Sequence, residues 1–152
     1  MPPFQFRLLT LLRLRIADRD ERRGELAKAQ RAADILRQQR EQLETDLADN
    51  QNLSRRMKSP GAVNVDSLLQ ISRFELLLKA QRQHLLSQEK QVAAEIERRR
   101  QILVEADRQV RVLEKLDENQ RRQHSRLESQ AAAKELDEIA GLGQRRNQEV
   151  TR

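Results

Sequence analysis

The chain has no cysteine, no tryptophan and no tyrosine, and aromatic residues make up only 2% of its 152 residues. Without cysteine it has no disulfide framework and no thiolate chemistry. Protein interiors are close-packed, so a chain with so few bulky side chains is not expected to build a large globular core. These absences direct the interpretation towards an elongated architecture.

Charge is abundant: it accounts for 36% of the residues, with 30 basic and 24 acidic side chains and a net charge of +6. High charge without aromatics is typical of long helices and coiled coils, and also of disordered chains. The regular leucine spacing described below favours the helices. Charge this well mixed is mostly a solvated helix surface. Because the chain has neither a dense basic run nor an aromatic stacking platform, no specific nucleic-acid partner is expected.

The N-terminal run is apolar but is broken by Arg7, Arg13 and Arg15. No stretch of about 18 uncharged apolar residues occurs, so no segment is expected to span a membrane. A secretory signal is not expected either, since no small-residue cleavage site follows the run. An arginine-rich transit peptide is an alternative. However, acidic residues begin at Asp18 and the leucine phase continues, which favours the start of a structural helix.

The first long segment, residues 6–57, has apolar side chains at steps of three and four, the spacing of one helix face. They include Leu8, Leu12, Ile16, Leu26, Ala29, Ala33, Leu36, Leu43 and Leu47. The phase slips near Gly24, and glycine costs a helix about 1 kcal/mol relative to alanine. The pattern predicts one long helix over residues 6–57, weakest at residues 19–29.

The second long segment has a sustained heptad pattern that starts at Leu68 and keeps its phase to Ala131. One half of the seam consists of Ile71, Leu78, Leu85, Val92, Arg99, Ala106, Leu113, Gln120 and Leu127. Beyond Leu113 the seam turns polar, which predicts looser packing or a partner there. A helix over residues 66–140 is predicted, capped by Asp66 or Asn64. Gly141 and Gly143 mark its expected end, and residues 141–152 are predicted to form a flexible tail.

Between the two patterns lies the stretch KSPGAVNVDS, residues 58–67. Inside a helix, Pro60 costs about 3 kcal/mol and Gly61 about 1 kcal/mol, so a turn over residues 58–65 is favoured. A continuous helix that pairs with a second copy is the alternative. In the hairpin, facing residues have numbers that sum to about 122 if the turn centres on Gly61, which places Leu12 opposite Val110.

The predicted fold is therefore all-α: an antiparallel two-helix coiled-coil hairpin with a longer second helix, forming a single domain over residues 1–140. The second helix is expected to overhang the N-terminus from about Glu118. An isolated polar helix is marginal in water, so this overhang is expected to need a partner or to fray.

Catalytic candidates are few. The two histidines, His84 and His124, stand 40 residues apart on one predicted helix, roughly 60 Å along its axis, so they cannot share a metal ion. No phosphate-binding loop or nucleophile elbow occurs, and two helices form no cleft that would tune a pair of carboxylates. Neither enzymatic activity nor a cofactor is expected.

With catalysis not expected, binding to a partner is the function that the sequence favours. The hairpin brings the arginines of the N-terminal run to the same end as a second group on the second helix, which includes Arg121, Arg122 and Arg126. One interpretation is an ordinary solvated surface. The other is a basic tip that docks on an acidic ring, steered by charge.

Three motifs, taken in order, resemble the FliJ family of the bacterial flagellar type III export apparatus. The first is Phe6-Arg7-Leu8 with Leu11-Leu12, Arg15, Leu26-Ala27 and Ala29. The second is Leu113-Glu114-Lys115-Leu116, and the third is the acidic segment Lys134-Glu135-Leu136-Asp137-Glu138-Ile139-Ala140. The central break also falls where the hairpin of that family turns, so the resemblance covers nearly the whole chain.

The resemblance implies a non-enzymatic cytoplasmic stalk that docks on the hexameric export ATPase and promotes its assembly. It also implies contacts with the cytoplasmic domain of the export gate protein FlhA and with export chaperones, and membrane association only through these partners. The implied ATPase-ring interface is Phe6, Arg7, Leu11, Arg13, Arg15, Arg122, Leu136, Asp137 and Glu138. The implied gate interface is Gln42, Leu53, Leu77, Ala80 and His84. A member of the family has tyrosines in the gate interface, whereas this chain has none.

Two other functions remain open from the sequence. One is the equivalent stalk protein of a virulence-type secretion system, which genomic neighbours would distinguish. The other is a basic coiled-coil protein that binds nucleic acid or has a structural role. A gel shift tests nucleic-acid binding, because a true binder loses affinity steeply as salt rises.

Overall fold

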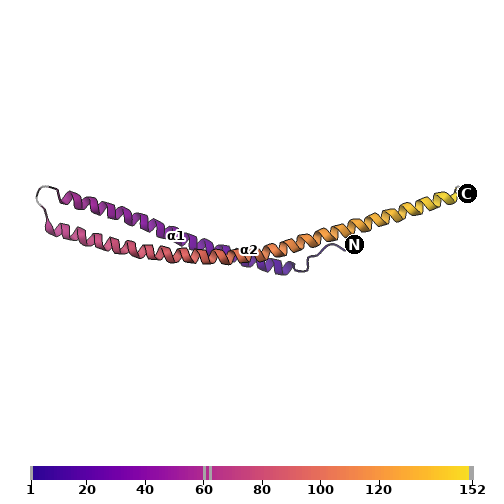
Figure 1. Cartoon of the computed structure of the whole chain (residues 1–152), viewed down its shortest axis with the longest axis horizontal. Helices are drawn as coiled ribbons and strands as arrows, with labels where there is room; N and C mark the ends of the chain where they lie inside the picture. Colours follow the sequence, from indigo (N-terminus) through magenta and orange to yellow (C-terminus); the bar gives the residue numbers. More distant parts are fainter. Residues whose placement is uncertain (1, 60, 62, 151–152) are drawn as a thin grey trace. The chain divides into compact units, whose positions relative to one another are not determined.

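The computed structural model describes residues 2–59, 61 and 63–150, with side chains described as far as Arg146. Two helices make up the regular structure: α1, Leu9–Met57, and α2, Val65–Val150 (Figure 1). No strand occurs among the described residues. The predicted all-α fold, two helices packed against each other with the second one longer, is confirmed.

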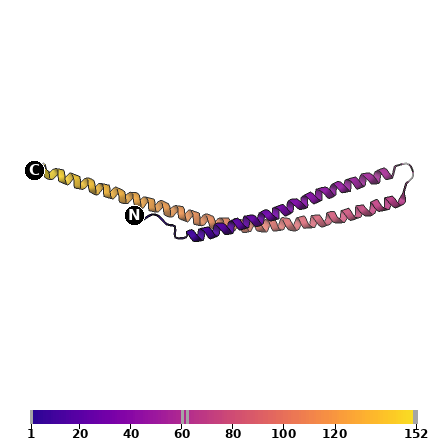
Figure 2. The ribbon, with the colours of Figure 1, turned by 180° about the vertical axis from the view of Figure 1, so that it is seen from behind.

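The chain divides into two compact units, and each contains part of both helices. The turn unit, Asp20–Glu105, holds the end of α1, the connection and the start of α2. The terminal unit consists of Met1–Arg19 together with Ala106–Arg152. In the turn unit the two helical halves run side by side and antiparallel, as the two opposite views show (Figures 1 and 2).

Hydrogen bonds at the end of α1 and at the start of α2 cap the helices where the connection meets them. The amides of Lys58 and Ser59 donate to the carbonyls of Ser54 and Arg56 as α1 ends. Asn64 caps α2: its Oδ1 accepts from the amides of the second and third helical residues, at 3.1 and 3.4 Å. Of the two predicted caps, Asn64 is therefore the one used. Gly61 has a φ of 153°, a conformation that favours glycine; Pro60 lies outside the described residues.

The core of the turn unit is a seam of leucines from both helices. Leu43, Leu47 and Leu78 are buried together, and Leu85 packs against them. Ion pairs flank this seam and fix the same register: Arg40 Nε lies 2.9 Å from Glu89 Oε1, and Arg82 Nη1 lies 3.8 Å from Glu44 Oε2. Such antiparallel pairs within one chain are what the predicted hairpin requires.

The core of the terminal unit is built from Phe6, Leu12 and Val110, with Ile16 and Leu113 packed against them. Leu12 faces Val110, as the predicted register requires. Phe6 itself precedes the helix, because α1 starts at Leu9 rather than at residue 6. Its carbonyl accepts a hydrogen bond from the Leu9 amide, so this buried phenylalanine stabilises the entry into α1.

The end of α2 differs from the sequence prediction. The helix continues from residue 140 through Gly141 and Gly143 to Val150, a stretch that the sequence assigned to a flexible tail. Neither glycine has a positive φ, so neither forms the expected left-handed cap. A glycine costs a helix only about 1 kcal/mol relative to alanine, and the arginines and glutamine that follow favour helix.

Candidate partner-binding surfaces

The first half of the predicted ring interface lies just before α1 and in its first turns, in the terminal unit. Arg7, Leu11, Arg13 and Arg15 are exposed there, whereas Phe6 is only 7% exposed and belongs to the core. Four residues of this group are thus available to a partner, and Phe6 positions them. Neighbouring leucines are exposed too, Leu14 at 63%.

The second half of the predicted ring interface lies on α2 in the same unit. Arg122 is exposed and donates to the carboxylate of Glu118 one turn earlier. Leu136, Asp137 and Glu138 are exposed as well, Leu136 at 68%. The two halves lie on different helices, and their use by one partner remains a prediction.

The non-helical N-terminal segment, residues 2–8, covers the polar part of the α2 seam. The ring of Phe4 packs at 59° against the ring of His124, with the centroids 5.7 Å apart. The guanidinium of Arg121 lies 5.3 Å from the Phe4 centroid, a cation–π contact, and its Nε donates to Asp117 at 3.0 Å. The seam residues that the sequence left without a partner are therefore partly covered by this segment.

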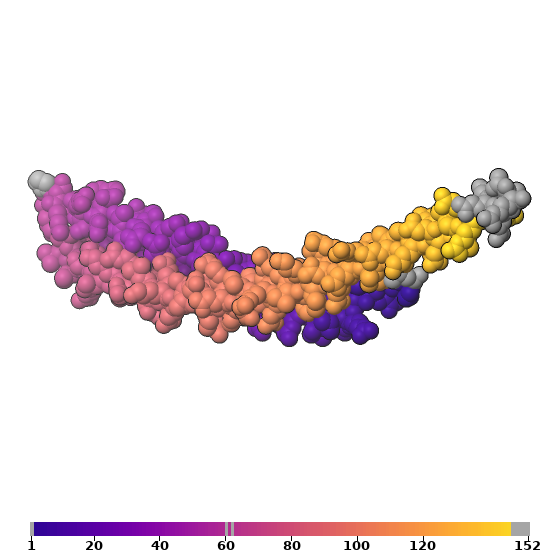
Figure 3. All heavy atoms as spheres, turned by 45° about the vertical axis from the view of Figure 1, so that its right-hand side comes forward, coloured from indigo at the N-terminus to yellow at the C-terminus, as the bar shows by residue number. Residues whose placement is uncertain are grey.

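Beyond this segment, the described side chains at the end of α2 are not covered by the rest of the chain. Every side chain from Ala132 to Arg146 is exposed, and Figure 3 shows the yellow end of α2 extending past the indigo N-terminal residues. The overhang thus begins after His124, later than the predicted Glu118, because Phe4 reaches that far along the helix.

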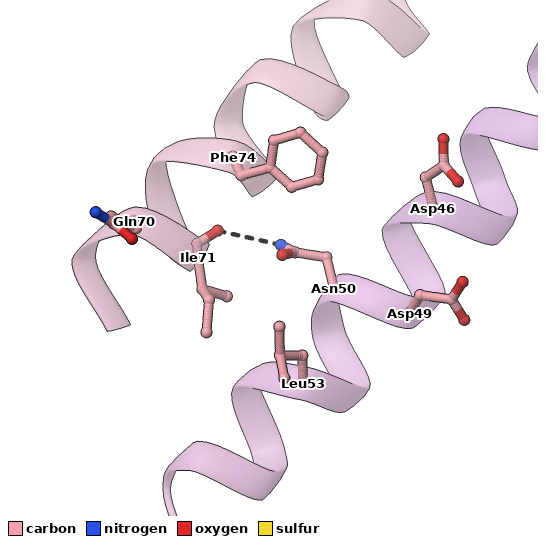
Figure 4. Close-up of a pocket in the computed structure, with 7 residues that line it drawn as sticks. All are labelled: Asp46, Asp49, Asn50, Leu53, Gln70, Ile71 and Phe74. Carbon is pink, nitrogen blue, oxygen red and sulfur yellow. Dashed lines mark hydrogen bonds between the residues drawn. The ribbon is translucent and has the colours of Figure 1, made fainter. Parts of the chain in front are cut away.

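The predicted gate residues lie in the turn unit on both helices. Gln42 and Leu53 are on α1, and Leu77, Ala80 and His84 are on α2; all five are exposed. Leu53 lines a groove between the helices, whose other wall includes Phe74 (Figure 4). Phe74 is 48% exposed and Leu53 is 45% exposed, so the groove presents an aromatic and an aliphatic side chain together.

Sequence reasoning missed Phe74. It follows the same α2 face as Leu77 and His84, since residues 74, 77 and 84 recur at helical spacing. It also supplies an aromatic group on a surface where the resemblance called for one. The sequence did contain a signal for Phe74, because the whole chain has only three phenylalanines. The sequence did not give the register of the two helices, which places Phe74 across from Leu53.

The rim and floor of this groove are polar. Asp46 and Asp49 form the rim on α1, and Asp46 accepts a hydrogen bond from Gln42 Nε2 at 3.0 Å. Asn50 forms the floor: it is 7% exposed, and its Nδ2 donates across the interface to the Ile71 carbonyl at 3.1 Å (Figure 4). The surface therefore combines apolar contacts with negative charge and a fixed register.

A charged cluster around Glu95 lies on α2 and reaches across to α1. Arg98 and Arg99 both donate to Glu95, and these hydrogen bonds lower the pKa of the Glu95 carboxyl to about 2. Arg99 also crosses to α1, where its Nη1 donates to the Glu25 carbonyl at 2.6 Å. Arg99 thus fills a seam position of the heptad pattern with a polar contact between helices.

No group of three or more potential metal ligands occurs among the residues that the structure describes. Within those same residues, no helix is long and apolar enough to cross a membrane.

Two long helices that pair antiparallel through heptad seams, with exposed surfaces in both units, define a coiled-coil hairpin. A protein-family model described as "Flagellar FliJ protein" matches residues 4–149, and the chain belongs to this family. It is therefore a coiled-coil protein related to flagellar export, from a family of non-enzymatic export components. No curated protein matches the chain significantly, nor does any solved structure.

Proposed function

We propose that this protein is a cytoplasmic stalk that docks on the hexameric export ATPase and promotes its assembly and activity. The observation that carries the proposal is the family match over residues 4–149, together with the exposed basic start of α1. Arg7, Arg13 and Arg15 offer positive charge to an acidic ring, and steering by charge raises the rate of such encounters.

In the same proposal, the groove side of the turn unit contacts the cytoplasmic domain of the gate protein FlhA. This surface consists of Leu53, Leu77, Ala80 and His84, together with Phe74, which the sequence prediction did not include. Gln42 lies at its edge. Partially exposed aromatic and leucine side chains at a groove are favourable anchors. Export chaperones are further proposed partners, and association with the inner membrane follows through the ATPase and the gate.

The ring contact is tested by the stimulation of a cognate hexameric ATPase. Reversing charge at Arg13, Arg15 and Arg122 to glutamate is expected to abolish stimulation by the full chain. The matched control reverses Arg55, Arg56 and Arg73, which are exposed in the turn unit, and should stimulate as the unmodified chain does. Full stimulation by the first variant contradicts the ring contact.

The gate contact is tested by titration calorimetry with the purified FlhA cytoplasmic domain. Phe74→Ala is expected to weaken binding about tenfold, the size of effect that removing an aromatic anchor produces. Leu76→Ala is the control, because Leu76 is 68% exposed and lines no part of the groove. Equal affinities for the two variants contradict a contact at this groove.

A further inference from the structure

The first 17 residues of the chain differ electrostatically from the rest. They contain three arginines and no acidic residue, and the first acid is Asp18. Among the described residues, no acidic partner lies within ion-pair distance of Arg7, Arg13 or Arg15. By contrast, three other arginines of the same unit are paired with acids one turn away: Arg111, Arg121 and Arg122.

The same stretch exposes apolar surface on the side away from the core. Leu12 and Ile16 face α2, whereas Leu8, Leu9, Leu11 and Leu14 are exposed. At 100° per residue, Leu11 and Leu14 lie roughly opposite the core face, with Arg13 and Arg15 on their two sides. Arginines that flank exposed leucines can extend outward while the leucines enter an apolar phase.

A hydrophobic groove that takes up an amphipathic helix is the less favoured partner for the leucines of this face. A helix docked in a groove presents anchors at positions i, i+3 or i+4, and i+7. Along this stripe, the helix begins at Leu9 and Asp18 follows Leu14 one turn later, so the apolar stripe is too short. An interfacial helix needs only shallow apolar insertion together with basic side chains at the phosphates.

We propose that the exposed face of residues 7–15 forms a binding surface for an anionic lipid bilayer, with Leu11 and Leu14 inserted and Arg7, Arg13 and Arg15 at the headgroup phosphates. The terminal unit then contacts the membrane directly, in addition to any association through protein partners. The proposal does not depend on ring docking, although both use these arginines.

The test is flotation of the full chain with vesicles of phosphatidylcholine alone or with a third phosphatidylglycerol. Binding to the anionic vesicles alone is expected, weakening as salt rises. Each basic side chain near such a surface contributes about a fivefold change in partitioning, so Arg7→Gln, Arg13→Gln and Arg15→Gln together should lower it about a hundredfold. The control replaces Arg55, Arg56 and Arg73 with glutamine and should float as the unmodified chain does.

A second variant, Leu11→Gln with Leu14→Gln, tests insertion separately from charge, because its net charge is unchanged. This leucine variant should no longer float with the anionic vesicles. Circular dichroism of the arginine and leucine variants checks that both stay helical. Failure of the unmodified chain to float with anionic vesicles overturns the proposal, and so does equal loss in the arginine control. Loss of ATPase stimulation by the arginine variant without any vesicle binding assigns this face to an acidic protein and also overturns it. No lipid enters the ATPase assay, so the two proposals fail independently.

Discussion

Asn50 offers the sharpest test of how this hairpin fixes its register. It is the buried polar residue of the turn unit, and its amide donates to the Ile71 carbonyl of the facing helix. Leucine at this position gives up a hydrogen bond with a net contribution of about 0.5–1.5 kcal/mol. It also buries an apolar side chain, which contributes about 1.5–3 kcal/mol. The free energy of unfolding of Asn50→Leu should therefore rise by about 1 kcal/mol.

The gain in stability should come with a loss of specificity. In any displaced register or swapped dimer, Asn50 would be buried without the Ile71 carbonyl, at a cost of about 1–3 kcal/mol. Leucine carries no such penalty, so Asn50→Leu reduces the difference in free energy between the hairpin and its alternatives. A buried asparagine in a coiled coil specifies the register in the same way. Asn50→Ala, which loses the bond and fills no space, should instead lower the free energy of unfolding by about 1–2 kcal/mol.

Two measurements decide this. Urea unfolding followed by circular dichroism gives the free energies. Spin labels on cysteines introduced at Thr45 and Gln81 give the distance between helices, and the chain has no other cysteine to react. One narrow distance population is expected with Asn50 and a second population with leucine. A destabilised Asn50→Leu with a single unchanged distance would refute both steps of the reasoning.

The remaining predictions concern the core, the turn and pH. Leu47→Ala should lower the free energy of unfolding by about 2–5 kcal/mol, because Leu47 is 3% exposed; Leu76→Ala should change it by less than about 0.5 kcal/mol, both in urea titrations. Replacing Pro60 and Gly61 with alanines should favour a continuous rod that dimerises, seen as a doubled mass in light scattering; an unchanged monomer contradicts this. The pKa of Glu95 is lowered to about 2, so its stabilising effect is present above pH 4.5 and is lost as the pH falls towards 2; Glu95→Gln should flatten that acid limb in thermal melts, and an unchanged limb counts against it.

The hairpin and its register were predictable because local rules determine them. Heptad spacing defines the seam of α2, and the helix-breaking cost of Pro60 and Gly61 locates the turn. The position of the turn then determines which residue numbers face each other in the antiparallel pair, which is why Leu12 faces Val110 as predicted. These terms need no knowledge of the partner helix beyond its apolar face.

Features that depend on tertiary contacts were harder to predict from the sequence. Phe4 covers His124 because the N-terminal segment is not helical. The prolines of this segment disfavour a helix there, but they do not determine where Phe4 packs. The groove between Leu53 and Phe74 becomes visible only when the register is known. The extension of α2 past Gly141 reflects a glycine penalty too small to decide by itself where a helix ends.

Charge pairing separates the residues that hold this molecule together from those available to partners. The interpretation of mixed charge as solvated helix surface suits the turn unit, where acids within 4 Å accompany Arg23, Arg37, Arg40, Arg82, Arg98, Arg99 and Arg100. The net charge of +6 does not reveal the exception, because it does not show where along the chain the unpaired bases lie. Unpaired arginines beside exposed leucines contribute little to folding, since neither group is buried by the chain itself. Their contribution must come from what they bind, and for that reason substitutions of the exposed Arg13, Leu14 and Arg15 should alter partner affinity while leaving the unfolding transition in place.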